Sequence, residues 1–171
     1  DPFLYHIVGK NRHKKVVTDF KGTLRVDSLA QITDPNLDTE EVSDMGVQRI
    51  YSAGGSFTLA EDSLSKYSGR FTGHHKMDFA SYDKAPTEIW FFSDTPNKGS
   101  GIRYDGVWTS YKTGKSKPVI WSKDLFRFAN DILKEFSIGE RDVEINEKYR
   151  SLGWDNFWEN DEWWAESKVK M

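Results

Sequence analysis

Short runs of aromatic and β-branched residues, separated by turn residues, recur along the first 121 residues of this chain. The first two runs, Phe3 to Val8 and Lys15 to Phe20, flank a polar turn and predict a hairpin. Gly54 and Gly55 predict a second tight turn. Seven or eight strands at this spacing predict a mainly β domain, either an up-and-down barrel or a sandwich. Residues 23–26 continue the first hairpin after Gly22, and the other predicted strands are 48–52, 56–59, 67–82, 88–92, 106–111 and 118–121.

The composition fits one folded domain with a tail. The length of 171 residues is ordinary for a single hydrophobic core and too short for two cores of usual size. Aromatic residues reach 15%, which is more large apolar surface than a disordered chain carries. We therefore expect the chain to fold.

The charge pattern and the absence of cysteine exclude several function classes. The 24 basic and 27 acidic residues are spread along the chain, so no basic field for nucleic acid is expected. No apolar run approaches the eighteen or so residues that span a bilayer, and we expect a membrane-peripheral or soluble protein. The start of the chain lacks the features of a leader, which predicts a mature or trimmed form. Without cysteine there are no disulfides, thiolate nucleophiles or cysteine-built metal sites.

One amphipathic helix is predicted from about Lys123 to Phe136, after the last strand. Ser122 is a suitable N-cap, and Gly139 is a suitable residue to end the segment. The apolar residues recur at three- and four-residue spacing, which is the period of a helix with one apolar face. They are Leu125, Phe128, Ala129, Ile132, Leu133 and Phe136.

The composition changes at residue 140, so we predict a barrel with its helix over 1–139 and an extension over 140–171. The extension has nine acidic and five basic residues and is too polar to form its own core. Its aromatic residues are expected to dock either on this domain or on another protein. The candidate partner-binding residues are Trp154, Trp158, Trp163 and Trp164.

The histidines are the first candidates for chemistry. His74 and His75 are adjacent, but neighbouring side chains on a strand point to opposite faces, so we predict no metal site there. His6 lies in an apolar strand. A single inward histidine is more often a hydrogen-bonded core residue than a catalyst.

The order of the predicted elements resembles that of the lipocalins. A hairpin is followed by an irregular loop, several short strands and one helix. Within that superfamily the chain resembles the central domain of the violaxanthin de-epoxidases over roughly Phe3 to Gly139. The resemblance implies a lipocalin-like up-and-down barrel. The stretches that carry it are Leu4 to Asp27, Asp34-Pro35-Asn36, Ala85 to Trp90, Val119 to Ser122 and Ser137 to Asp142.

In that family the barrel binds a xanthophyll and ascorbate in the thylakoid lumen, where inward acids and tyrosines protonate the epoxide and ascorbate supplies the electrons that reduce it. His6 matches the family's conserved histidine. The family's strand aspartate, however, falls near His75 or Lys76, and its tyrosines fall near Asp94 and Trp121. The resemblance therefore implies the barrel and the compartment more than the reaction.

We accordingly expect a non-catalytic domain that binds a carotenoid or another lipophile, or that serves as a peripheral thylakoid-lumen subunit of a photosynthetic pigment–protein complex. The alternatives are an active, ascorbate-dependent xanthophyll-modifying enzyme that uses His6, Asp78 and Asp94, or a secreted lipocalin unrelated to plastids. No metal cofactor is expected. The predicted cavity residues are His6, His75, Trp90, Trp108 and Trp121.

Overall fold

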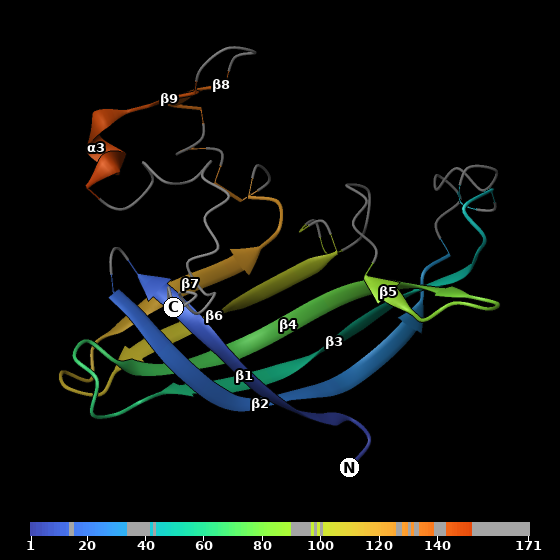
Figure 1. Cartoon of the computed structure of the whole chain (residues 1–171), viewed down its shortest axis with the longest axis horizontal. Coiled ribbons are helices and arrows are strands. Elements are labelled where there is room, and N and C mark those ends of the chain that lie inside the picture. The colour runs from blue at the N-terminus through green and yellow to red at the C-terminus, as the bar shows by residue number, and fades with distance from the viewer. Residues whose placement is uncertain are drawn as a thin grey trace, which may run out of the picture.

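The fold is mainly β, as the sequence predicts. The structure is a computed structural model, and Figure 1 shows its strands. It describes residues 1–13, 16–33, 42, 44–89, 97, 99, 101–125, 128–129, 131, 134–138 and 143–151. The strands of the main sheet are β1 (Leu4–His13), β2 (Val16–Gln31), β3 (Val47–Glu61), β4 (Gly69–Tyr82), β5 (Glu88–Ile89), β6 (Ile102–Ser110) and β7 (Ser116–Ser122).

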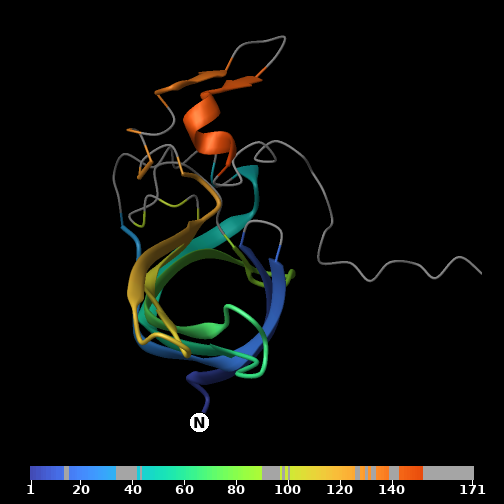
Figure 2. The ribbon, with the colours of Figure 1, turned by 90° about the vertical axis from the view of Figure 1, so that its left-hand side faces the viewer.

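The main sheet is antiparallel, with the strand order β1-β2-β3-β4-β6-β7, and β5 pairs with β4. Strands adjacent in sequence are therefore mostly adjacent in space, as in an up-and-down meander. Viewed end-on in Figure 2, the strands curl around a central space. β1 and β7 form the two edges, and no ladder joins them within the described residues. The predicted barrel is thus not confirmed as a closed one.

Glycine residues allow the strands to approach closely at the centre of the curl. Gly73 and Gly106 are directly opposite each other on β4 and β6, and Gly73 also pairs with Phe57 on β3. A Cβ atom on Gly106 would lie 2.9 Å from Cζ of Phe57 and 2.5 Å from the carbonyl oxygen of Thr72. The ring of Phe57 thus occupies the space that a side chain at residue 106 would otherwise fill, whereas a Cβ atom on Gly73 would collide with the backbone of Asp105 and Gly106.

The tight turn predicted at Gly54 and Gly55 is wrong, because β3 runs continuously through both residues. Neither glycine has a positive φ angle, so neither is needed for a turn. Glycine is needed here because there is no room for a Cβ atom. A Cβ atom on Gly55 would collide with the carbonyl oxygen of Arg25 on β2 and would lie 2.9 Å from Nε2 of His75. The pair marks a close approach of backbones within a long strand.

The sheet has apolar clusters on both faces. Phe57, Leu59 and Phe71 are buried on the concave face, where half-buried side chains from β1, β2, β6 and β7 pack against them. Ile50 and Ala80 are buried in a second cluster. Because side chains alternate along β3, and its pairing with β4 is regular from residue 49 to 60, the second cluster lies on the opposite face.

The helix predicted over 123–136 is not confirmed. Among the described residues of this segment, the amide of Ala129 donates to the carbonyl of Leu125 at 2.8 Å, which closes a single turn. Phe136, the predicted last residue of the helix, instead begins β8, and its backbone pairs with Ile145. β8 (Phe136–Ile138) and β9 (Val143–Ile145) form a separate two-stranded sheet.

This small sheet spans the domain boundary predicted at residue 140. A four-residue helix, α3 (Glu147–Arg150), follows it and is capped by the side chain of Asn146. Among the described helices, none is both long and apolar enough to cross a membrane.

Candidate functional site

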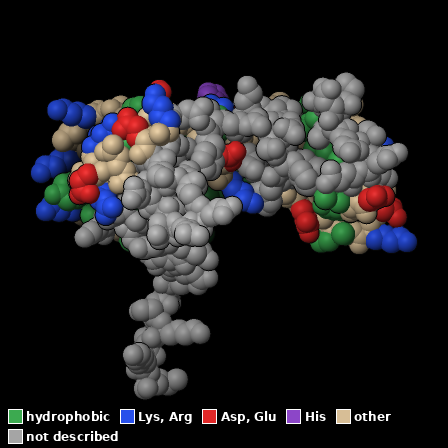
Figure 3. Space-filling view, turned by 90° about the horizontal axis from the view of Figure 1, so that it is seen from above, with side chains coloured by type: hydrophobic (Ala, Val, Ile, Leu, Met, Phe, Trp, Pro, Cys, Tyr) green, Lys and Arg blue, Asp and Glu red, His purple; other side chains and the backbone are tan. Residues whose placement is uncertain are grey.

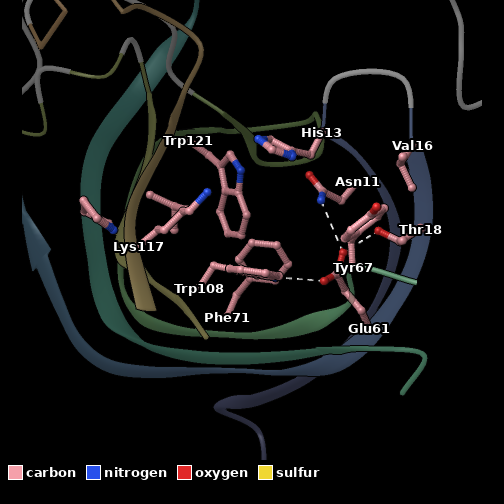
Figure 4. Close-up of a pocket in the computed structure, with 12 residues that line it drawn as sticks. Asn11, His13, Val16, Thr18, Glu61, Tyr67, Phe71, Trp108, Lys117 and Trp121 are labelled. Carbon is pink, nitrogen blue, oxygen red and sulfur yellow. Dashed lines mark hydrogen bonds between the residues drawn. The ribbon is translucent and has the colours of Figure 1, made fainter. Parts of the chain in front are cut away.

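A cavity of about 630 Å³ lies inside the curl of the sheet (Figure 4). Its walls come from both edges of the sheet and from the middle strands, so the curl itself creates the space. The residues that line it are Asn11, His13, Val16, Thr18, Glu61, Tyr67, Phe71, Trp108, Lys117, Pro118, Val119 and Trp121.

Aromatic rings form much of the cavity wall. Phe71 and Trp108 are directly opposite each other on β4 and β6, so their side chains lie on the same face. The ring of Trp121, on β7, lies 4.8 Å from that of Phe71 between centroids, at an angle of 53°. Figure 4 shows these three rings together in the cavity. Such a wall favours a flat or chain-like apolar molecule.

Glu61 is the buried charged group of the cavity, with 5% of its surface exposed. Its Oε1 atom accepts hydrogen bonds from the hydroxyl of Thr18 and, at 3.3 Å, from the side-chain amide of Asn11. Its Oε2 atom accepts from the backbone amide of Gly69 at 2.7 Å and from the indole of Trp108 at 2.9 Å. A carboxylate has about four lone-pair positions, and here four donors occupy them.

This arrangement explains how one end of the curl is held together. The four donors belong to β1, β2, β4 and β6, and Glu61 itself ends β3. One carboxylate thus joins five strands, and it leaves no acceptor position open for a ligand. Glu61 therefore shapes the cavity, and the remaining wall offers mainly apolar contact.

A second cavity of about 300 Å³ lies beside the first and shares Asn11 and Trp121 with it. Its wall includes the ring of Tyr104, which packs edge-on against Phe57 with 5.3 Å between centroids. Burial raises the pKa of the Tyr104 phenol, so this hydroxyl stays protonated at neutral pH. The concave face therefore continues as an apolar surface beyond Trp121.

Two of the predicted cavity residues, Trp108 and Trp121, line the larger cavity. His75 lies on the same face of β4 as Phe71 but is buried beneath the surface, with 1% exposed. Its Nε2 atom donates to the carbonyl oxygen of Arg25 at 3.0 Å, and its Nδ1 atom has no hydrogen-bond partner. Burial lowers the pKa of His75, which favours the neutral ring.

His6 and Asp78 do not lie at the cavity. His6 is exposed on β1, while its neighbour Ile7 packs on the concave cluster. Asp78 is fully buried on β4, but it shares a face with Ala80, opposite to the face of Phe71 and His75. Neither oxygen of its carboxylate has a hydrogen-bond partner. The structure thus brings the cavity tryptophans together and keeps both of these predicted residues apart from them.

The remaining predicted residues lie outside the described part of the chain. These are Trp90, Asp94, Trp154, Trp158, Trp163 and Trp164.

His74 is exposed, whereas His75 is buried. Within the residues that the structure describes, no group of three or more histidine or acidic side chains could hold a metal ion.

Glu61 and three of its donors, Asn11, Thr18 and Gly69, are not among the residues predicted from the sequence. A signal was present, because Glu61 continues the alternation of Phe57 and Leu59 and so belongs to the inward face of the same strand. An acid in such a row predicts either a functional group or a hydrogen-bonded structural one. The donors Asn11 and Trp108 lie 50 and 47 residues away, and nothing in their local sequence indicates the pairing.

No protein-family model matches this chain, and comparisons with curated proteins and with solved structures found no match either.

Proposed function

We propose that this chain is a lipocalin-type binding module that holds a small, mainly apolar molecule inside its curled sheet. The observation that carries the proposal is the cavity of about 630 Å³ walled by Phe71, Trp108 and Trp121. Cavities of about 300 to 1,000 Å³ with apolar walls and a few polar groups are typical of small-molecule sites.

The energetics favour an apolar ligand. Each 100 Å² of apolar surface removed from water contributes roughly 2.5 kcal/mol, and aromatic walls add contacts of defined geometry. The carboxylate of Glu61 already accepts four hydrogen bonds, so it has no acceptor position left for a hydrogen-bond donor of the ligand.

Closure of the sheet into a barrel is also part of this proposal, with the ligand enclosed by cavity residues that include members of β1, β2 and β7. The resemblance to violaxanthin de-epoxidases extends the proposal to carotenoids in the thylakoid lumen. The cavity by itself supports a lipophile in general.

Titration with Nile red, a neutral fluorescent lipophile, tests the proposal. We expect saturable binding with a rise in dye fluorescence and quenching of tryptophan. Val119→Trp places a large side chain in the cavity wall and should weaken binding by about tenfold or more, because it fills the space the dye needs.

The matched control is Ile120→Trp, the same change at the next residue, which is 44% exposed. It should bind the dye as the unchanged protein does, and far-ultraviolet circular dichroism should show that both variants fold. Absence of saturable binding, or equal binding by Val119→Trp and Ile120→Trp, would contradict the proposal.

A further inference from the structure

Three pairs of neighbouring strands end at one end of the curl, on the left in Figure 1. They are β1 with β2, β3 with β4, and β6 with β7. His13, Tyr67 and Lys117 from this end line the larger cavity. We call this region the mouth end and define it as residues 10–13, 16–19, 61–70 and 109–118.

The mouth end is basic, although the whole chain has a formal charge of −3. It contains five lysines and two arginines but three acids. One of the acids, Glu61, is buried under its four donors and is not part of the outer surface. Figure 3 shows Lys and Arg side chains gathered at the left-hand end of the molecule. The lysines are Lys10, Lys66, Lys112, Lys115 and Lys117, and all five are exposed.

Large apolar side chains are exposed among these lysines. Leu64 is 92% exposed and Tyr67 is 68% exposed, both in the turn between β3 and β4. The carboxylate of Asp62 fixes this turn, since it accepts from the amide of Leu64 at 3.0 Å and from the hydroxyl of Ser65 at 3.2 Å. Tyr111, in the turn between β6 and β7, is 39% exposed. Single exposed apolar residues are ordinary, but here they coincide with the basic end and the cavity.

We propose that the mouth end docks on the surface of an anionic lipid bilayer. Basic side chains near such a surface are attracted by its negative charge, and the apolar turn residues can enter the interface between headgroups and acyl chains. The rest of the chain carries the excess of acidic residues and is repelled by the same surface, so the charge asymmetry orients the molecule. Docked in this way, the cavity faces the lipid.

Only the charges and the exposed apolar side chains of the mouth end support the proposed docking. That a lipophile passes from the bilayer into the cavity rests in addition on the proposed binding function. The experiment separates the two.

Flotation of the full chain with lipid vesicles tests the docking. One set of vesicles is phosphatidylcholine alone, and the other contains phosphatidylglycerol in addition. We expect binding only to the second set, and we expect added salt to weaken it because screening reduces the attraction. Equal binding to both sets, or binding to neither, would overturn the proposal.

Paired variants locate the surface. Lys112→Glu with Lys115→Glu should reduce partitioning onto the anionic vesicles by about tenfold or more, and Leu64→Ser should reduce it several-fold. Lys76→Glu with Lys84→Glu makes the same change in net charge at exposed residues outside the mouth end, and it should bind far better than the first pair. If both pairs lose binding equally, the effect is one of net charge and the mouth end is not the docking surface.

Nile red binding without vesicles is measured on the same variants. We expect it to be unchanged, because Leu64, Lys112 and Lys115 do not line either cavity. Flotation without dye binding would leave the docking in place and refute the proposed function. Dye binding without flotation would leave the proposed function in place and refute the docking.

Discussion

Glu61 is a buried carboxylate, and its four described hydrogen bonds come from neutral donors. The hydrogen bonds of a charged group are worth about 1.5–3 kcal/mol each, so the donors and the carboxylate depend on one another. The stability of the fold should therefore depend on both carboxylate oxygens, even when the size of the side chain is kept.

We predict that Glu61→Gln lowers the free energy of unfolding by about 2 kcal/mol or more, as measured by urea denaturation. The amide nitrogen of glutamine cannot accept a hydrogen bond, so the donors facing it lose their partner. Glu88→Gln, at an exposed residue of β5, should change the stability little. Equal stability of Glu61→Gln and the unchanged protein would indicate that the four hydrogen bonds do not form in solution.

His75 predicts a dependence of stability on pH. Burial lowers its pKa, with smaller opposing effects from the carbonyl of Arg25 and the charge of Asp27. In the unfolded chain the ring titrates near its ordinary value of about 6.5. Below that pH the unfolded state binds a proton that the folded state resists, so stability should fall as the pH is lowered from about 6.5 toward the folded-state pKa.

The contribution of one such histidine is at most about 1.4 kcal/mol per pH unit. His75→Gln should therefore flatten the dependence of the unfolding free energy on pH, measured by urea denaturation between neutral and mildly acidic pH. His74→Gln, at the exposed neighbouring residue, should leave the slope as it is. A slope that persists in His75→Gln would assign the effect to other groups.

At the scale of the elements, the pairing of Gly73 and Gly106 beneath Phe57 connects two neighbouring strand pairs. The ring of Phe57 lies where a side chain at residue 106 would stand, and at Gly73 the backbone of β6 is closer than a methyl group allows. The curl of β3, β4 and β6 depends on this local fit.

We predict that Gly106→Ala lowers the free energy of unfolding by about 1–3 kcal/mol, because the added methyl group must displace Phe57 or the backbone at Thr72. Urea denaturation measures the loss. Ser116→Thr adds a methyl group at an exposed residue of β7 and serves as the control. An unchanged free energy of unfolding for Gly106→Ala would mean that β4 and β6 can move apart without loss of stability.

At the scale of the whole molecule, the C-terminal extension concentrates four of the seven tryptophans. Each buried tryptophan can contribute on the order of 2 kcal/mol, so together they could anchor a contact with another protein. The main sheet has its own apolar clusters, and these draw on residues before the extension, from Ile7 to Trp121.

We predict that deletion of residues 153–171 leaves the urea midpoint and Nile red binding unchanged but abolishes association with a larger complex. Native gel electrophoresis of extracts from the source, with the full and the truncated chain, measures the association. A lowered urea midpoint would show that the tryptophans belong to the core of this domain, and a surviving association would place the contact elsewhere.

The mainly β class and most strand positions followed from the sequence, because β-branched and aromatic runs bounded by turn residues depend on local preferences. β1, β2 and β4 lie where the runs 3–8, 15–26 and 67–82 predict strands. Trp108 and Trp121, which were named from the sequence as cavity residues, line the larger cavity. Gly54 and Gly55 were misassigned, since the same residue type serves both a turn and a close backbone approach, and only the neighbouring strand distinguishes them.

The tertiary structure decided the rest. It gave residues 136–138 a partner in β9, although their local spacing favours a helix. It brought Asn11, Thr18 and Trp108 to Glu61 across as many as 50 residues of sequence, and it placed the lysines of the mouth end at the end of the sheet where Lys117 lines the cavity. These relations depend on the register between strands and on the curl of the sheet. Both are set by contacts between residues far apart in the chain, which no local pattern encodes.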